Sequence, residues 1–246
     1  MALLSVNLNK IALMRNARRT GVPDLLHFAR LVHHAGAHGI TVHPRPDERH
    51  IRRADIPALA TVIAPWRPGF EFNIEGYPTP DFLDLVAEVV PEQVTLVPDP
   101  PGVLTSEEGW RLGAADIASM RAVVDRLHAH RSRVILFIDP DPLAVAPVRD
   151  TGADGVEIYT GGYATAYRDG HPEALRDACA TTARAAAQLG LVVNVGHDLN
   201  LLNLPPLLAA LPPIAEASIG HELTADALLH GWEATIVAYR DALAAP

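Results

Sequence analysis

The chain has 246 residues, 49% of them hydrophobic, so it can bury a sizeable core and does not have the composition of a disordered protein. Its 20 basic and 29 acidic residues give a formal charge of -9, which disfavours general binding to nucleic acid or to an anionic membrane. The single cysteine, Cys179, excludes a disulfide framework and a cysteine-built metal site. These features, and the lack of a charged or long apolar stretch in residues 1–7, predict a cytoplasmic protein without a signal peptide or membrane span.

Short apolar runs alternate with longer helical patterns along the chain, which is typical of βα units on parallel strands. The predicted strands are 3–7, 39–43, 70–74, 93–97, 133–138, 155–159, 191–195 and 217–219. The predicted helices are 24–34, 56–63, 80–89, 117–130, 143–149, 172–189, 204–211 and 224–243. No long linker or low-complexity tract interrupts this alternation, so we expect a single domain over residues 1–246.

Two segments, 36–43 and 152–159, resemble each other. In each, one glycine can end a helix in the left-handed conformation and a second opens a strand. These segments contain the second and sixth predicted strands, which lie opposite each other if the strands close into a (β/α)8 TIM barrel of the α/β class. A doubly wound open sheet is the alternative, but no glycine-rich dinucleotide fingerprint follows any predicted strand.

Polar residues gather at the carboxyl ends of the predicted strands, where barrels of this fold carry their catalytic groups. Because buried charge is costly unless it is paired or used, this convergence favours an active site over a purely stabilising network. The residues are Asn7, Asn9, Lys10, His43, Arg45, Glu75, Glu157, His197, Asp198, Gly220 and His221.

Each of these residues also has a structural interpretation. His43 could be a core histidine that bonds a neighbouring carbonyl, but the segment 43–50 places two imidazoles and two guanidiniums on a proline-stiffened loop, which favours a functional role. Glu157 lies two residues before Tyr159, and we expect its side chain to point into the barrel. Its structural alternative is an ion pair with an interior arginine or lysine.

The chain has twelve histidines, and those outside the strand ends fall on predicted helices or helix ends, where we expect most of them at the surface. They are His27, His33, His34, His38, His128, His130, His171 and His230. No close pair such as H-x-H or H-E-x-x-H occurs. Scattered ligands can converge in a barrel, but an acid/base site without a metal fits the pattern better.

Two groups of residues could bind phosphate. Gly220 lies just before the last helical pattern, where a glycine lets free N–H groups approach an anion, and loops after the seventh and eighth strands commonly bind phosphate in this fold. The second group is cationic, with a solvated basic patch as its alternative interpretation: Lys10, Arg15, Arg18, Arg19, Arg45 and Arg49. Cations beside the barrel mouth of an acidic chain suggest small phosphorylated substrates.

Seven segments, in this order, strongly resemble the pyridoxine 5'-phosphate synthase family. They are VNLNKIA at 6–12, RNAR at 15–18, GITVHPRPDERHI at 39–51, NIEGY at 73–77, TLVPD at 95–99, GHDLN at 196–200 and SIGH at 218–221. The match spans essentially the whole chain, and the histidine-arginine-histidine loop is distinctive.

The resemblance implies a (β/α)8 barrel with additional helices, assembled as a homo-octamer. It implies the condensation of 3-amino-2-oxopropyl phosphate with 1-deoxy-D-xylulose 5-phosphate to pyridoxine 5'-phosphate, with release of phosphate and water, in vitamin B6 biosynthesis. His43 and Glu75 would accept protons, His197 would donate one, and Glu157 would support the transition state. The amino ketone phosphate would be held by Asn7, Arg18, Asp198, Gly220 and His221, and the pentulose phosphate by Arg45, His50 and Thr105. Such proton transfers involve no redox step, so we expect no cofactor.

Some positions depart from the better-known family pattern. Asn9 and Lys10 replace an Asp-His pair, and the permanent cation of Lys10 can bind phosphate but is a poor proton shuttle. Asp198 replaces a glycine, so binding there must use its N–H. Tyr159 replaces a histidine, and residues 99–102 replace a charged stretch before Thr105.

Two alternatives remain. One is another phosphosugar-processing barrel enzyme, an aldolase or isomerase, although Lys10 alone could form a Schiff base at a strand end. The other is a non-catalytic binder of phosphate metabolites.

Overall fold

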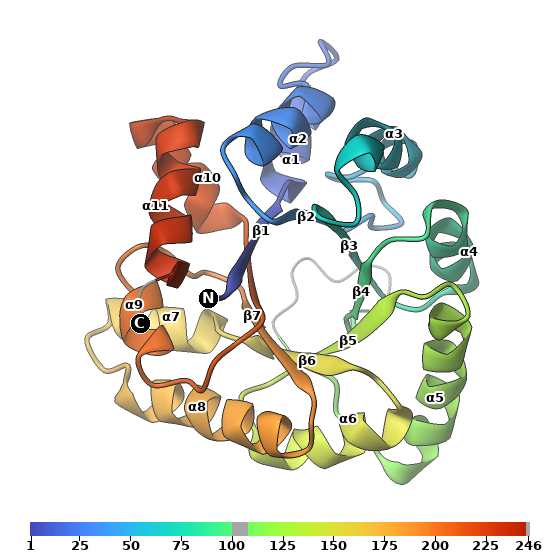
Figure 1. Ribbon diagram of the computed structural model, residues 1–246, viewed down its shortest axis with the longest axis vertical. Helices are drawn as coiled ribbons and strands as arrows, with labels where there is room; N and C mark the ends of the chain where they lie inside the picture. Colours follow the sequence, from blue (N-terminus) through green and yellow to red (C-terminus); the bar gives the residue numbers. More distant parts are fainter. Residues whose placement is uncertain (100–107, 245–246) are drawn as a thin grey trace.

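The computed structural model describes residues 1–99 and 108–244. Its strands form one closed parallel barrel in which each strand pairs with the next in the chain and β8 pairs with β1 (Figure 1). The strands are β1 (Leu3–Asn7), β2 (Gly39–Val42), β3 (Glu71–Gly76), β4 (Gln93–Leu96), β5 (Arg133–Ile138), β6 (Gly155–Tyr159), β7 (Val192–Gly196) and β8 (Glu216–Ile219). The predicted (β/α)8 TIM barrel is confirmed, and β2 and β6 lie opposite each other because strand order follows the chain.

Helices surround this barrel on all sides (Figure 1). They are α1 (Asn9–Asn16), α2 (Leu25–His34), α3 (Asp55–Ile63), α4 (Pro80–Val89), α5 (Ala114–His128), α6 (Val145–Thr151), α7 (Gly161–Arg168), α8 (Glu173–Gln188), α9 (Leu204–Leu208), α10 (His221–His230) and α11 (Trp232–Ala244). Two 3-10 turns, η1 (Ala64–Trp66) and η2 (Pro142–Ala144), lie between them. None of the helices in the described ranges is long and apolar enough to cross a membrane.

Two helices were not predicted, and one predicted helix is two. α1 has no side-chain cap at its start, and α7 opens with Gly161 and Gly162, so both lack the usual signals of a helix start. The predicted helix 224–243 is divided into α10 and α11 at Gly231, whose φ of +82° lies in the left-handed region. Both unpredicted helices start within two residues of a strand's carboxyl end and belong to the site region.

The strands bury an apolar face against the helices and a polar face inside the barrel. Outward side chains such as Leu4, Val6 and Ile40 are fully buried in the core. Inside, Gln93 on β4 donates to Glu216 on β8 at 3.1 Å. Because β4 and β8 lie on opposite sides, this bond crosses the barrel interior.

Further hydrogen bonds tie the interior side chains of neighbouring strands. Ser5 and Thr41 hydroxyls lie 2.7 Å apart, and the Asn73 amide donates to Thr95 at 3.1 Å. Buried polar groups need such partners, and the bonds fix the strands on which the site is built. Toward the amino end of the strands, Arg133 on β5 pairs with Glu71 on β3.

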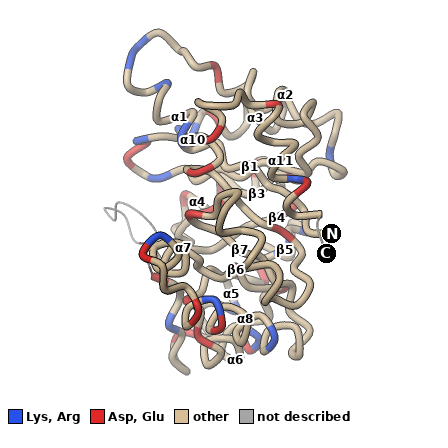
Figure 2. Tube along the Cα trace, turned by 90° about the vertical axis from the view of Figure 1, so that its left-hand side faces the viewer, with Lys and Arg blue, Asp and Glu red and all other residues tan. Residues whose placement is uncertain are grey.

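Charge is mixed over the exterior. Lysine and arginine are interspersed with aspartate and glutamate along the outer helices and loops (Figure 2). The net negative charge is therefore spread over the molecule rather than gathered on one element.

Candidate active site

His43 and Glu75 lie side by side at the barrel mouth. His43 follows β2 and Glu75 is near the end of β3, and both are buried. The imidazole Nδ1 lies 3.7 Å from Glu75 Oε2. Strand alternation explains the placement, because Thr41 and Asn73, two residues earlier on each strand, also point into the barrel.

Asn7 and Asn9 hold this pair from the end of β1. The Asn9 side-chain oxygen accepts the backbone N–H of His43 at 2.9 Å. The backbone N–H of Asn9 donates to Asn7 Oδ1 at 3.0 Å, which turns the Asn7 NH2 group toward Glu75 Oε2, 3.4 Å away. Asn9 was placed at a strand end by the sequence, but its bond to His43 could not be predicted.

Burial shifts the acid/base properties of both groups. It raises the pKa of Glu75 to about 7, an effect that Arg45 opposes and that Glu216 and Asp99 reinforce. Burial, followed by the positive charge of Arg45, holds the pKa of His43 well below its usual range. At neutral pH His43 is therefore a neutral imidazole, and Glu75 exists in both protonation states, so the pair can accept and release protons.

Glu157 is buried inside the barrel, as predicted, and only 1% exposed. Its Oε2 has no hydrogen-bond partner within residues 1–99 and 108–244. Burial and the nearby Glu75 and Glu216 carboxyls raise its pKa well above the ordinary value. None of the ion pairs among the described residues involves Glu157, so the alternative of an interior arginine or lysine partner is wrong.

Gly196 on β7 makes room for the Glu157 carboxyl. A Cβ at this position would overlap Oε1. The glycine of the GHDLN segment therefore leaves the space that the interior Glu157 carboxyl occupies.

The segment 43–51 carries Arg45 and His50 toward the mouth. Arg45 is buried and forms an ion pair with Asp99 at 2.8 Å. His50 Nδ1 accepts the N–H of Ile51 at 2.9 Å, and burial, then Arg45, lowers its pKa to about 4. His50 is therefore a neutral hydrogen-bonding group at pH 7. The charges at this part of the mouth are those of Arg45 and Asp99, which have opposite signs.

Arg15 anchors that segment rather than facing an anion. Its guanidinium pairs with Asp55 at 2.7 and 2.9 Å and donates to the backbone oxygen of His50 at 3.2 Å. Arg15 was one of the cationic residues predicted to bind phosphate, and in the structure it has a structural role instead.

His197 and Asp198 follow β7 in left-handed backbone conformations, with φ of +79° and +57°. Non-glycine residues rarely adopt this region, and such strain is typical of functional sites. The imidazole packs against both Phe137 and Tyr159, with ring centroids 4.9 and 5.4 Å away. Burial lowers the pKa of His197.

Gly220 brings the start of α10 against the end of β1. A Cβ here would lie 2.9 Å from the Cβ of Asn7, so the contact needs a glycine. His221 is the exposed first residue of α10. The N-terminus of this helix therefore lies beside Asn7 at the mouth, and a helix N-terminus there is suited to an anion.

Other predicted positions lie further out or outside the described ranges. Lys10, half-buried in α1, is close enough to lower the pKa of both His50 and His197. Arg18 is exposed in the turn after α1. Thr105 lies outside the described residues.

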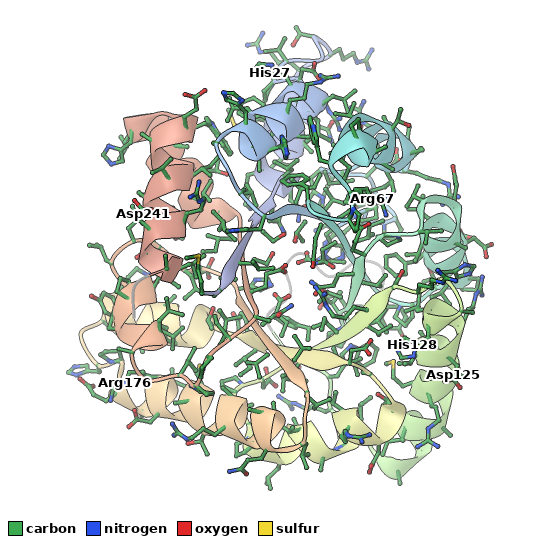
Figure 3. All side chains as sticks on the ribbon, in the orientation of Figure 1. His27, Arg67, Asp125, His128, Arg176 and Asp241 are labelled. Atoms are coloured by element: carbon green, nitrogen blue, oxygen red, sulfur yellow. The ribbon has the colours of Figure 1, made fainter. Side chains whose placement is uncertain are left out.

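The remaining histidines do not join the site. His27 on α2 and His128 on α5 lie on the outer helices, away from the barrel axis (Figure 3). His128 contacts Asp154 there at 2.8 Å. Within residues 1–99 and 108–244, no group of three histidine, cysteine, aspartate or glutamate side chains is placed to hold a metal ion.

A cavity of about 710 Å³ opens beside His43. It is bounded by the segment after β2 and by the start of α4, and its lining includes Arg45, Asp99, Tyr77 and Phe82. Asp99 was not among the predicted site residues. The sequence feature that could have indicated Asp99 is its place three residues after the end of the buried strand β4. The size suits a small-molecule site.

The site contains buried histidine and glutamate side chains whose pKa values are shifted, and it lies next to a helix N-terminus at the carboxyl ends of the barrel strands. These features define a (β/α)8 barrel enzyme of the acid/base type. Residues 4–245 match the model of one family, described as pyridoxal phosphate biosynthesis protein PdxJ. The chain belongs to this family.

Curated relatives carry the same assignment. A protein of Allorhizobium ampelinum named pyridoxine 5'-phosphate synthase is 51% identical over 98% of this chain and 97% of its own length. Its namesake in Mesorhizobium japonicum is 50% identical over 96% of each chain.

More distant solved structures share the fold. Phosphoribosyl anthranilate isomerase from Thermotoga maritima superposes with a TM-score of 0.62 at 12% identity, covering 99% of this chain and 98% of that one. Tryptophan synthase from M. tuberculosis gives a TM-score of 0.65 at 14% identity, covering 98% and 92%. At these identities the likeness concerns the barrel alone.

Proposed function

We propose that the chain is a pyridoxine 5'-phosphate synthase. It condenses 3-amino-2-oxopropyl phosphate with 1-deoxy-D-xylulose 5-phosphate and releases phosphate and water. The observation that carries the proposal is the buried His43–Glu75 pair at 3.7 Å, held by Asn7 and Asn9 in a chain that is 51% identical to a protein of that name. The barrel acts as one catalytic domain over residues 1–246.

The reaction needs several proton transfers, and the site supplies a group for each kind. Joining an amine to a ketone, enolising and eliminating water all require a base that takes a proton from carbon or nitrogen and an acid that protonates a leaving oxygen. Glu75 and His43 accept protons. His197 donates one from the opposite side of the mouth. Glu157, a buried carboxyl whose Oε2 has no hydrogen-bond partner among the described residues, supports the transition state.

The two phosphates bind at different corners. Asn7, Arg18, Asp198, Gly220 and His221 hold the amino ketone phosphate beside the α10 N-terminus, with Asp198 using its backbone N–H. Lys10, Arg45, His50 and Thr105 hold the pentulose phosphate. Arg45 is paired with Asp99 in this structure, so binding there requires the guanidinium to share its donors between the carboxylate and the phosphate.

None of these steps transfers electrons, and the histidine and glutamate side chains can carry the proton transfers, so we propose that the enzyme works without a cofactor or metal. Dialysis against a chelator should leave the rate unchanged, and a loss restored by one metal ion would refute this part of the proposal. We further propose a cytoplasmic homo-octamer, whose mass light scattering would measure directly.

Growth of a vitamin B6 auxotroph separates the synthase from a non-catalytic binder. The wild-type gene should restore growth without added vitamin, and variants with His197→Asn or Glu75→Gln should not. If these variants support growth as well as the wild type, catalysis at this site is refuted. An aldolase or isomerase would instead turn over one sugar phosphate without the amine.

A further inference from the structure

The backbone of His197 is strained, so contacts with neighbouring residues must stabilise its conformation. Its φ of +79° and that of Asp198, +57°, place two consecutive non-glycine residues in the left-handed region. Such conformations persist only where the surrounding structure fixes them. The question is which residues hold the histidine, because its imidazole must keep one direction to serve as a proton donor.

Thr160, the residue between β6 and α7, holds the backbone. Its fully buried side-chain oxygen lies 2.6 Å from the carbonyl oxygen of His197 and 2.5 Å from that of Gly196. Its own N–H donates to the same Gly196 oxygen at 2.9 Å. From the other side, the side-chain amide of Asn203 donates to the carbonyl oxygen of Asp198 at 3.0 Å.

Tyr159, the last residue of β6, holds the imidazole. Its ring meets the imidazole edge-on, at 5.4 Å and an interplanar angle of 79°. Phe137 on β5 is fully buried and supports both rings, at 5.6 Å from Tyr159 and 4.9 Å from His197. A Cβ on Gly161 would overlap the Tyr159 ring, so this glycine leaves the space in which the tyrosine lies.

We propose that residues 159–161 form the positioning segment of His197, in which Thr160 fixes the histidine backbone, Tyr159 fixes its imidazole and Gly161 makes room for Tyr159. These are positioning residues, since they act through His197. The inference rests on the proposed function, which makes His197 the proton donor. The positioning segment acts on the proton transfer from His197. A displacement of a reacting group by 1 Å would slow such a step about a hundredfold.

Several charged groups face His197 besides these neutral neighbours. Asp198 on its own loop and Asp99 after β4 raise its pKa, and Arg45 after β2 and Lys10 in α1 lower it, but burial has the largest effect and lowers it. His43 lies across the mouth and interacts with it as well. Removing the Tyr159 ring admits water while these charges stay, so the pKa of His197 should then rise toward its ordinary value.

Substitution of Thr160 tests the backbone contact. Thr160→Val keeps the shape but removes the hydroxyl, and we expect kcat to fall about tenfold to a hundredfold with KM little changed. Thr160→Ser should restore the rate. The matched control is Thr182→Val, which removes a hydroxyl that bonds the Ala178 carbonyl at 2.9 Å in α8. Equal rates for Thr160→Val and Thr182→Val would overturn the inference.

An NMR titration tests the ring contact without relying on turnover. The protein is labelled at histidine, and the His197 signal is the one that is absent from His197→Asn. Tyr159→Ala should raise the pKa of His197, and Tyr159→Phe, which keeps the ring, should raise it less. An unchanged titration in Tyr159→Ala would overturn the inference. If that variant does not fold, the Thr160 pair decides. Failure of the wild type to form product would refute the proposed function instead, and the titration would still report on the positioning segment.

Discussion

At the scale of single residues, the site depends on a carboxyl whose environment makes it a useful base. Glu75 is buried, is contacted by the Asn7 amide and lies beside His43. Glu75→Gln keeps the shape of this side chain and removes its proton-accepting form. We expect turnover to fall about a thousandfold while both substrates still bind. Steady-state rates and calorimetric titrations measure the two quantities separately.

The control for that variant is Glu233→Gln, an exposed glutamate on α11, which should leave both quantities unchanged. Equal loss of affinity and rate in Glu75→Gln would argue for a structural role of Glu75. Comparing Glu75→Gln with Glu233→Gln therefore distinguishes a catalytic base from a residue with a purely structural role.

The pH dependence of the rate reports the same carboxyl. Its pKa, raised to about 7 chiefly by burial, means that the ionised base is lost as pH falls through 7. The kcat/KM should therefore decrease about tenfold for each pH unit below about 7. Burial holds the pKa of His43 well below its usual range, so the imidazole is already neutral at pH 7. A profile that is flat from pH 7 down to about 5 would contradict this assignment.

At the scale of elements, the mouth is formed by contacts between strand ends and the first turns of helices. β1 and α10 meet where Gly220 lies against Asn7. Gly220→Ala would place a Cβ 2.9 Å from the Asn7 Cβ and 3.3 Å from its backbone oxygen, which forces the two elements apart. We expect kcat/KM to fall at least about tenfold, mainly through weaker binding of the amino ketone phosphate.

Gly162→Ala in α7 is the matched control, because its Cβ would make only an ordinary contact with Leu175 at 3.7 Å. Activity of this variant should match the wild type. If Gly220→Ala is equally active, the close approach of β1 and α10 has no part in binding.

The elements themselves were largely predictable, and the contacts between them were not. All the barrel strands follow from apolar runs with β-branched residues, and residues at their ends supply His43, Glu75 and His197. α1 and α7 lack start signals, so the pattern gave no warning of them. The Arg45–Asp99 pair joins residues 54 positions apart, and Arg15 bonds Asp55 across 40. Such pairings depend on how the barrel closes, which local patterns do not encode.

At the scale of the whole molecule, the barrel interior couples stability to pH. Glu216 is buried, and its pKa is raised from 4.5 to about 7, chiefly by burial. The folded state therefore binds this proton more tightly than the unfolded state. The resulting stabilisation is complete below about pH 4.5 and is lost as pH rises to about 7, a difference of about 3 kcal/mol.

Glu216→Gln removes this titration and keeps an oxygen that can accept from Gln93. We expect its free energy of unfolding, measured by denaturant titration, to fall less than that of the wild type between pH 4.5 and 7. The exposed Glu233→Gln should follow the wild type. Parallel pH curves for Glu216→Gln and the wild type would show that Glu216 does not titrate in this range.

This barrel is a synthase that closes a pyridine ring from two phosphorylated substrates. The most direct test of this activity is to incubate the purified protein with 3-amino-2-oxopropyl phosphate and 1-deoxy-D-xylulose 5-phosphate and to measure pyridoxine 5'-phosphate and inorganic phosphate together. We predict that both products form in equal amounts and that Glu75→Gln forms them about a thousandfold more slowly. Absence of pyridoxine 5'-phosphate under conditions in which a known synthase makes it would contradict the account.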